Sequence, residues 1–245
     1  MNFYNFSGVK FIDGSFSEIM SELDSGGLMV VPAAPALATI NEDAEYHLAL
    51  QFSDIAIFDS GYFCMLLYFL KGIKVKKFSG LEFIREFLAA LVRGEKNQVY
   101  LVDPNQDDAK LNKKLFEKYD IPIIGNQYVS PQYQKNLVID EELLRDIKLK
   151  RPKYIVINLG GGVQELLGAY LKKNIEGPYK PIIICTGAAV AFLTGSQTHI
   201  PKFMDYLYLG WFARCISDPK RFIPRYIGGF KLIEIVVNTE MERVG

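Results

Sequence analysis

The stretch SDIAIFDSGYFCMLLYFL, residues 53–70, contains one example of the strand-then-helix pattern that decides the fold. An apolar run rises to a single carboxylate, Asp59, and breaks at Ser60-Gly61. A short apolar run bounded in this way is typical of a buried strand, and the longer segment after Gly61 predicts a helix that Gly72 ends. A carboxylate at the end of a buried strand costs free energy unless it is solvated, paired or used in chemistry.

The same alternation recurs along the chain. Further strands are predicted at 28–31, 98–103, 121–128, 153–159 and 180–185. Further helices are predicted at 41–53, 79–95, 104–120, 140–151 and 163–174. Ser79 and Glu82 have the spacing of a capping box at the start of one of these helices. Near-continuous apolar strands that alternate with helices predict an α/β fold with a mainly parallel sheet flanked by helices.

The composition changes after Gly195. Residues 199–231 are aromatic and locally basic, with Lys and Arg outnumbering Asp. We therefore expect an α/β body over residues 1–195 and a C-terminal, basic and aromatic helical appendage over 196–245, as part of the same domain or as a subdomain.

The bulk composition excludes several classes of protein. Lys and Arg total 28 and Asp and Glu total 28, so no overall positive field attracts nucleic acid. The N-terminus lacks the pattern of a signal peptide, and the apolar runs are too short to span a bilayer. The three cysteines, Cys64, Cys185 and Cys215, fit neither a disulfide framework nor a zinc site, so a reducing cytoplasm is expected. Neither His47 nor His199 is paired with a nucleophile in the sequence.

Ligands of open α/β sheets bind beyond the carboxyl ends of the strands, so the residues there are the first candidates for a site. Asp59 is the best candidate for a general base that accepts a proton from an attacking hydroxyl. The alternative is that Asp59 caps the following helix or turn, where Asp is also favoured. Asp103, which precedes Pro104, is expected to be a turn or cap residue.

Two glycine-rich turns could present backbone N–H groups to a phosphate. Gly160, Gly161 and Gly162 lie between a strand and a helix, and Gly187 lies in a second such turn. Neither turn is a GxGxxG or Walker motif, and glycines also serve ordinary tight turns, so both interpretations stay open. Gln164 and Glu165 fall at the start of the helix, close to any such ligand.

Taken in order, several segments resemble the WecG/TagA/CpsF glycosyltransferases, glycosyltransferase family 26, from about residue 27 to about residue 228. SDIAIFDSGYF (53–63) is similar to the family's ADLVLPDGIGV, and VINLGGGVQELL (156–167) to its FVGLGSPKQEKWI. The resemblance continues in KKFSGLEFIREFL (76–88), CTGAAVAFLTGSQTHIPKFM (185–204) and LGWFARCISDPKRFIPRYIGG (209–229).

The resemblance implies a Rossmann-like α/β fold with a C-terminal helical appendage. It also implies an inverting transfer of a sugar, a hexose or N-acetylhexosamine, from a UDP-sugar to a polyprenol-diphosphate-linked sugar. The products of the family are capsule, exopolysaccharide or teichoic acid. The reaction is expected to need no metal or other cofactor. The implied location is cytoplasmic, peripheral at the inner face of the bacterial membrane, with contact through the appendage. A homo-oligomer is also compatible with the sequence.

The resemblance also assigns residues by position. Asp59 matches the catalytic base of the family, and Gln164 and Glu165 match its Gln-Glu pair near the nucleotide and sugar. Lys77 takes the place of a family arginine. Arginines that match those of the appendage, as partners for diphosphate, are Arg214, Arg221 and Arg225.

The chain departs from the family pattern at several positions. The family's TPNPE is here PAAPA (32–36), and the lysine before Gln-Glu is Val163. These changes motivate an alternative function, in which a catalytically weakened family member acts as the binding partner of another glycosyltransferase.

Overall fold

The computed structural model describes residues 1–92, 98–134, 137–196 and 229–244. Within these ranges, nine strands form one sheet in the order β6-β5-β7-β8-β3-β4-β2-β1-β9. The seven strands from β6 to β2 run parallel, and β1 and β9 extend one edge in antiparallel fashion. The strands are β1 Asn2–Phe6, β2 Val9–Asp13, β3 Gly27–Val30, β4 Ile55–Ile57, β5 Val99–Asp103, β6 Gln127–Val129, β7 Tyr154–Ile157, β8 Ile182–Cys185 and β9 Met241–Val244.

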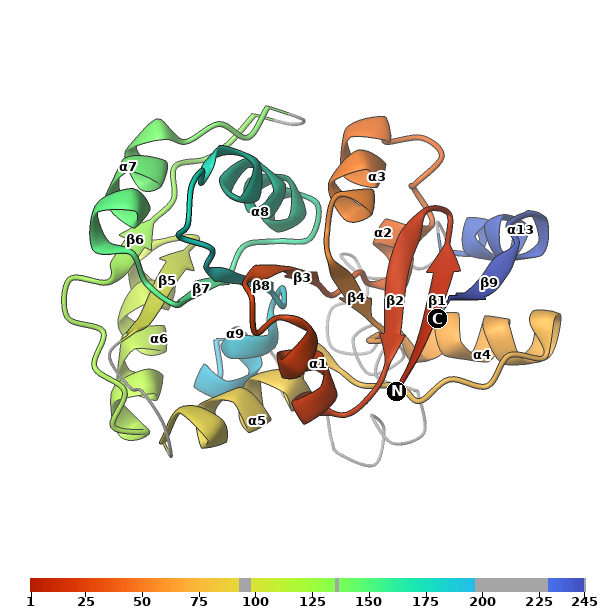
Figure 1. The fold of residues 1–245 in the computed structure, drawn as a ribbon, viewed down its shortest axis with the longest axis horizontal. Coiled ribbons are helices and arrows are strands. Elements are labelled where there is room, and N and C mark those ends of the chain that lie inside the picture. Colours follow the sequence, from red (N-terminus) through yellow and green to blue (C-terminus); the bar gives the residue numbers. More distant parts are fainter. Residues whose placement is uncertain (93–97, 135–136, 197–228, 245) are drawn as a thin grey trace.

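Helices cover both faces of this sheet, which confirms the predicted α/β fold (Figure 1). One face carries α2 Ala34–Leu37, α3 Ala44–Gln51, α4 Gly61–Lys71, α7 Glu141–Lys150, α8 Val163–Asn174 and α13 Lys231–Asn238. The other carries α1 Phe16–Glu22, α5 Gly80–Val92, α6 Gln106–Lys118 and α9 Ala189–Thr194.

The central strands are apolar throughout because both of their faces are buried. In β3, Leu28 and Val30 face one core cluster, while Met29 faces the other, as the period of two along a strand requires. No helix in the described part of the chain is long and apolar enough to cross a membrane.

The first hairpin was not predicted. Ser7 and Gly8, which connect β1 to β2, both have positive φ, at 54° and 80°. Two such residues in sequence match the twist of antiparallel strands and close a tight hairpin. Strand β6 begins at Gln127 rather than at residue 121, because Ile121 and Ile123 are buried in a core without pairing in the sheet.

The described part of residues 196–245 returns to the body of the protein. Helix α13 packs against α4 and α2, and β9 pairs with β1 in antiparallel register. Residues 197–228, which hold most of the expected appendage, lie outside the described residues.

The topology brings four strand ends together. β3 lies between β4 and β8, and β7 follows β8. After β4 the chain reverses direction across the sheet and crosses β3, β8 and β7 to form β5. The carboxyl ends on either side of such a reversal in strand order form the usual ligand crevice of open α/β sheets.

Packing of α8 on the sheet depends on Gly168. A Cβ at this position would lie 2.7 Å from Leu28 Cδ1 and 3.0 Å from Cys185 Sγ. We expect Gly168→Ala to lower the free energy of unfolding by about 1–2 kcal/mol, because the overlap outweighs the gain of about 1 kcal/mol in helix propensity. Gly160→Ala is the control, since nothing lies within 4 Å of a Cβ there. Urea denaturation measures both variants, and equal stabilities would contradict the packing argument.

Candidate active site

Asp59 lies between β4 and α4 in the sequence. Its side chain binds the start of α5 and not the start of α4. Ser60 is the N-cap of α4, and its Oγ accepts the Phe63 N–H at 3.2 Å. The Asp59 Oδ1 instead accepts the N–H of Gly80, the first residue of α5, at 2.9 Å. The capping alternative for α4 therefore belongs to Ser60. Asp59 thus lies at the N-terminus of α5, where the helix dipole stabilises negative charge.

Gln164 and Glu165 form a buried hydrogen-bond network at the start of α8. The Gln164 Oε1 accepts the Gly187 N–H at 2.7 Å, and its Nε2 donates to Glu165 Oε1 at 2.9 Å. The Glu165 Oε2 accepts the Gly162 N–H at 2.7 Å. Both side chains are 1% exposed. The network joins both glycine turns that the sequence singled out.

Gly80 connects Asp59 to this network. A Cβ on Gly80 would lie 3.2 Å from the Thr186 carbonyl oxygen and 3.3 Å from Val31 Cγ1. Thr186 directly precedes Gly187, whose N–H binds Gln164. The structure thus places Asp59, Gly80, Gly187 and the Gln-Glu pair around the carboxyl ends of β4, β3 and β8.

Glu165 carries the strongest electrostatic perturbation in this group. Burial raises the pKa of its carboxyl from 4.5 to about 7, against the opposing effect of its hydrogen bonds from Gln164 and Gly162. Tyr46 of α3 faces it: burial and then the charge of Glu165 raise the pKa of the Tyr46 hydroxyl. A carboxyl that titrates near neutral pH can hold a proton and release it under working conditions.

The triglycine turn is open on its outer side. Gly160 and Gly161 are exposed, and nothing lies within 4 Å of a Cβ on any of the three glycines. Gly162 has a φ of 93°, which favours glycine, and its N–H is taken by Glu165. Phosphate binding by this turn stays a prediction.

The remaining predicted residues divide into two groups. Lys77 is half-buried, and it and Asp59 both act on the buried Cys64 thiol. Burial, and then Asp59, raises the pKa of that thiol to about 12, and Lys77 opposes the increase. Lys77 therefore lies on the Asp59 side of the site. Arg214, Arg221, Arg225 and His199 lie outside the described residues.

The sequence analysis missed two buried hydroxyls beside this network. Thr186 Oγ1 and the Tyr46 hydroxyl are buried, and neither has a hydrogen-bond partner among the described residues. Thr186 follows the buried strand β8 as Asp59 follows β4, and that position was the signal that could have identified it. Tyr46 carries no comparable signal, because its aromatic ring fits an ordinary core position of an amphipathic helix.

Asp103 is neither a turn nor a cap residue. It is the last residue of β5 and fully buried, and Asn105 caps α6 instead. Its carboxylate accepts amide hydrogens from Asn112 at 2.6 Å, Gln127 at 2.7 Å and Asn158 at 2.7 Å. Burial raises the pKa of Asp103, and these three bonds oppose the increase. Asp103 thus ties α6, β6 and the end of β7 to β5.

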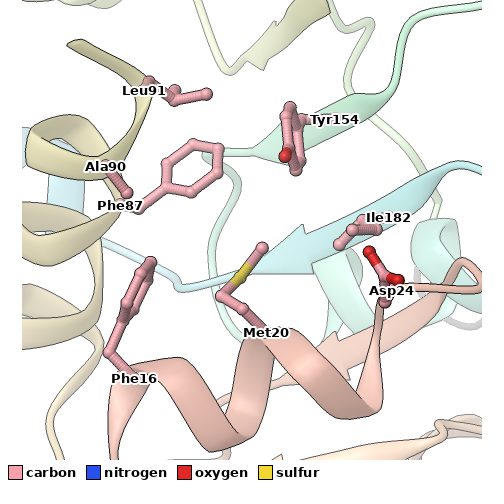
Figure 2. A pocket seen from close by; sticks show the side chains of 8 residues that line it. All are labelled: Phe16, Met20, Asp24, Phe87, Ala90, Leu91, Tyr154 and Ile182. Atoms are coloured by element: carbon pink, nitrogen blue, oxygen red, sulfur yellow. The ribbon is translucent and has the colours of Figure 1, made fainter. Parts of the chain in front are cut away.

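A separate pocket lies at the other end of the strands, beside their amino termini (Figure 2). It lies between α1 and α5, and Tyr154 and Ile182 line it from the amino-terminal ends of β7 and β8. Its other lining residues are mostly apolar, and none of the predicted site residues contributes to it. In the part of the chain that the structure describes, no group of three or more His, Cys, Asp or Glu is placed to hold a metal ion.

The titration of Glu165 predicts how stability depends on pH. The folded protein binds the Glu165 proton more tightly than the unfolded chain does, because the folded pKa is raised. The resulting stabilisation is complete below about pH 4.5 and is lost as pH rises towards 7, by about 3 kcal/mol in total. Glu165→Gln should remove this dependence, whereas Glu142→Gln, at an exposed position of α7, should retain it. Urea denaturation at pH 4 to 8.5 measures the difference; parallel curves for wild type and Glu165→Gln would contradict the assignment.

Asp103→Asn should lower the free energy of unfolding by about 1–3 kcal/mol. An amide nitrogen would then face one of the three amide donors that now bind the carboxylate. The matched control is Asp107→Asn on α6, whose side chain is exposed. Thermal and urea denaturation of the two variants would show equal losses if the buried bonds contribute nothing.

Comparison with known proteins places this geometry in a family. A search of curated proteins found no matching relative. Residues 4–244 match the glycosyl transferase WecG/TagA/CpsF family, so the match spans both described ends of the chain, from β1 to β9. The chain therefore belongs to the WecG/TagA/CpsF family of glycosyltransferases.

Proposed function

We propose that this glycosyltransferase moves a sugar from a UDP-sugar to a polyprenol-diphosphate-linked acceptor, with inversion at the anomeric carbon. The products would be intermediates of bacterial capsule, exopolysaccharide or teichoic acid. The observation that carries the proposal is the Asp59 carboxylate, oriented by the Gly80 N–H at the crevice of the sheet. Family membership supports the reaction class, and the location of Asp59 supports its role in the reaction.

Asp59 is assigned as the general base. As the acceptor hydroxyl attacks the anomeric carbon, its proton passes to the Asp59 carboxylate and the bond from that carbon to UDP breaks. The hydrogen bond from Gly80 holds the carboxylate in one orientation. Asp59 also lies at the start of α5, whose dipole favours the ionised form that a base requires.

The UDP leaving group gains negative charge that the protein must stabilise. We assign this to the N–H groups of the open turn at Gly160 and Gly161, with no metal, and to the arginines Arg214, Arg221 and Arg225. Lys77, on the Asp59 side, adds positive charge near the reacting groups. The Gln164–Glu165 pair acts by positioning, since its hydrogen bonds fix Gly162 and Gly187 relative to each other.

Turnover at a lipid-linked acceptor fits a protein peripheral at the inner face of the membrane.

The alternative, a weakened transferase that acts as a binding partner, is favoured by one observation. After β3, Ala33 caps α2 without any side-chain hydrogen bond, so this strand end offers no polar side chain to a sugar. A UDP-release assay with and without acceptor distinguishes the active transferase from the binding partner. The binding partner would bind nucleotide without releasing UDP.

Asp59→Asn tests the proposed base. The variant keeps an oxygen for the Gly80 N–H, so the site should stay folded and bind UDP as wild type does. The rate of transfer should fall by about 10²- to 10⁴-fold, the range typical of lost general-base catalysis. UDP release with a short-chain lipid-diphosphate sugar measures the rate, and calorimetry measures UDP binding.

Ser60→Ala is the matched control beside Asp59. It removes the N-cap of α4 and should cost about 1 kcal/mol of stability, with transfer retained. An Asp59→Asn enzyme at the wild-type rate would remove Asp59 as the base. Wild-type protein that binds UDP-sugars but releases no UDP with any acceptor would favour the binding-partner function.

A further inference from the structure

Helix α4 has two apolar faces, and only one of them is covered by described residues. Phe63, Cys64 and Leu67 are buried in the core of the body. Four large apolar side chains of the same helix are exposed, Met65, Tyr68, Phe69 and Leu70, and Met65 and Phe69 lie on the face opposite the core. Phe69 is 73% exposed, and its ring lies edge-on to that of Tyr68 at 5.1 Å.

This exposed face continues onto a neighbouring helix. The Lys71 Nζ donates to the Val237 carbonyl of α13 at 2.9 Å, which fixes the end of α4 beside that helix. Ile233 and Val237 of α13 are themselves exposed. Single exposed apolar side chains are ordinary, but several of them on two helices that pack together indicate an interaction surface.

The charge around α4 is positive. Residues 61–81 contain four lysines and no Asp or Glu. Lys74 and Lys76, in the loop after α4, are exposed. Acids among the described neighbours limit this field: Asp59 before α4, Asp13, which accepts the Lys76 backbone N–H at 3.1 Å, and Glu234 on α13.

We propose that the exposed face of α4 and the lysine loop 71–77 dock on an anionic lipid bilayer. Tyr and Phe suit the boundary between headgroups and acyl chains, and adjacent lysines bind anionic headgroups. A symmetric pair of chains that met through α4 would bring the same lysines face to face, which disfavours a second copy as the occupant. The helix is too short to span the bilayer, so it lies on the surface.

Docking in this way would orient the active site, and this consequence rests on the proposed function. Asp59 lies two residues before α4, and the lysine loop returns to Gly80, which binds Asp59. Both ends of the docking segment therefore meet at the proposed base. A lipid-linked acceptor, whose reacting sugar lies just above the headgroups, would then reach the crevice with its lipid still in the bilayer.

A single tryptophan on α4 tests the proposal directly. In a Trp211→Phe background, which removes the one native tryptophan, Phe69→Trp reports on the surroundings of this position. Vesicles of phosphatidylcholine with phosphatidylglycerol should shift its emission to the blue, and brominated acyl chains should quench it. Leu149→Trp, at an equally exposed position of α7, should show neither change. An unchanged Phe69→Trp spectrum with bound vesicles would overturn the proposal, even if another part of the chain binds lipid.

Charge reversal supplies the second test. Lys74→Glu with Lys76→Glu should lower partition onto anionic vesicles by at least about tenfold, whereas Lys110→Glu with Lys113→Glu on α6 should change it by less than about threefold. Transfer to a soluble short-chain acceptor should be the same in all these variants, so that failure of docking is distinct from failure of the proposed function. A concentration-dependent dimer in light scattering that Phe69→Ser abolishes would assign the surface to a second copy and overturn lipid docking.

Discussion

Coverage of both faces of the parallel sheet is the constraint on which the rest of this structure depends. Helices bury the strands from β2 to β6 on each side, so the strand interiors hold almost only apolar side chains. A polar group inside such a layer costs free energy unless it has a partner. Polar side chains are therefore concentrated beyond the strand ends, where Asp59 and Thr186 lie, and at the start of α8, which holds Gln164 and Glu165.

Asp103 shows the same constraint in a structural role. Its carboxylate is as buried as the strands around it, and three amide donors from three elements compensate for that burial. Asp59 differs because the described partner of its Oδ1 is a backbone N–H at the start of a helix. The donors around Asp103 lock it into the framework. The bond to Asp59 instead orients a single carboxylate at the start of α5.

The sequence was sufficient to predict most of the strands and helices that alternate along the chain, and many of their boundaries. The apolar run before Asp59, the helix from Gly61 and its end at Gly72, which has a φ of 66°, follow from local pattern alone. The hairpin at Ser7-Gly8 escaped because its strands are short and lie at the edge of the sheet, where the apolar signal is weaker. Residues 121–128 were assigned too long a strand because burial against a helix produces the same apolar signal as pairing in a sheet.

Contacts between distant segments account for what sequence reasoning could not supply about the site. The bond from Gly187 to Gln164 joins residues 23 positions apart, and that from Gly80 to Asp59 joins residues 21 apart. No local pattern encodes either. The raised pKa of Glu165 likewise follows from burial beneath α3, a tertiary property. Local pattern indicated which strand ends carry polar groups, and only the fold shows which of these groups touch.

The register of β3 and β8 bears on how this chain departs from its family. Val30 and Cys185 are partners, so Val31 and Thr186 leave the sheet side by side, and Gly80 packs against both. The end of β3 continues into Pro32 and Ala33 without a polar side chain, while the end of β8 supplies a hydroxyl with no described partner. The polar groups between these strands are thus carried by β8 and α8, and Thr186 and Gln164 are both buried there.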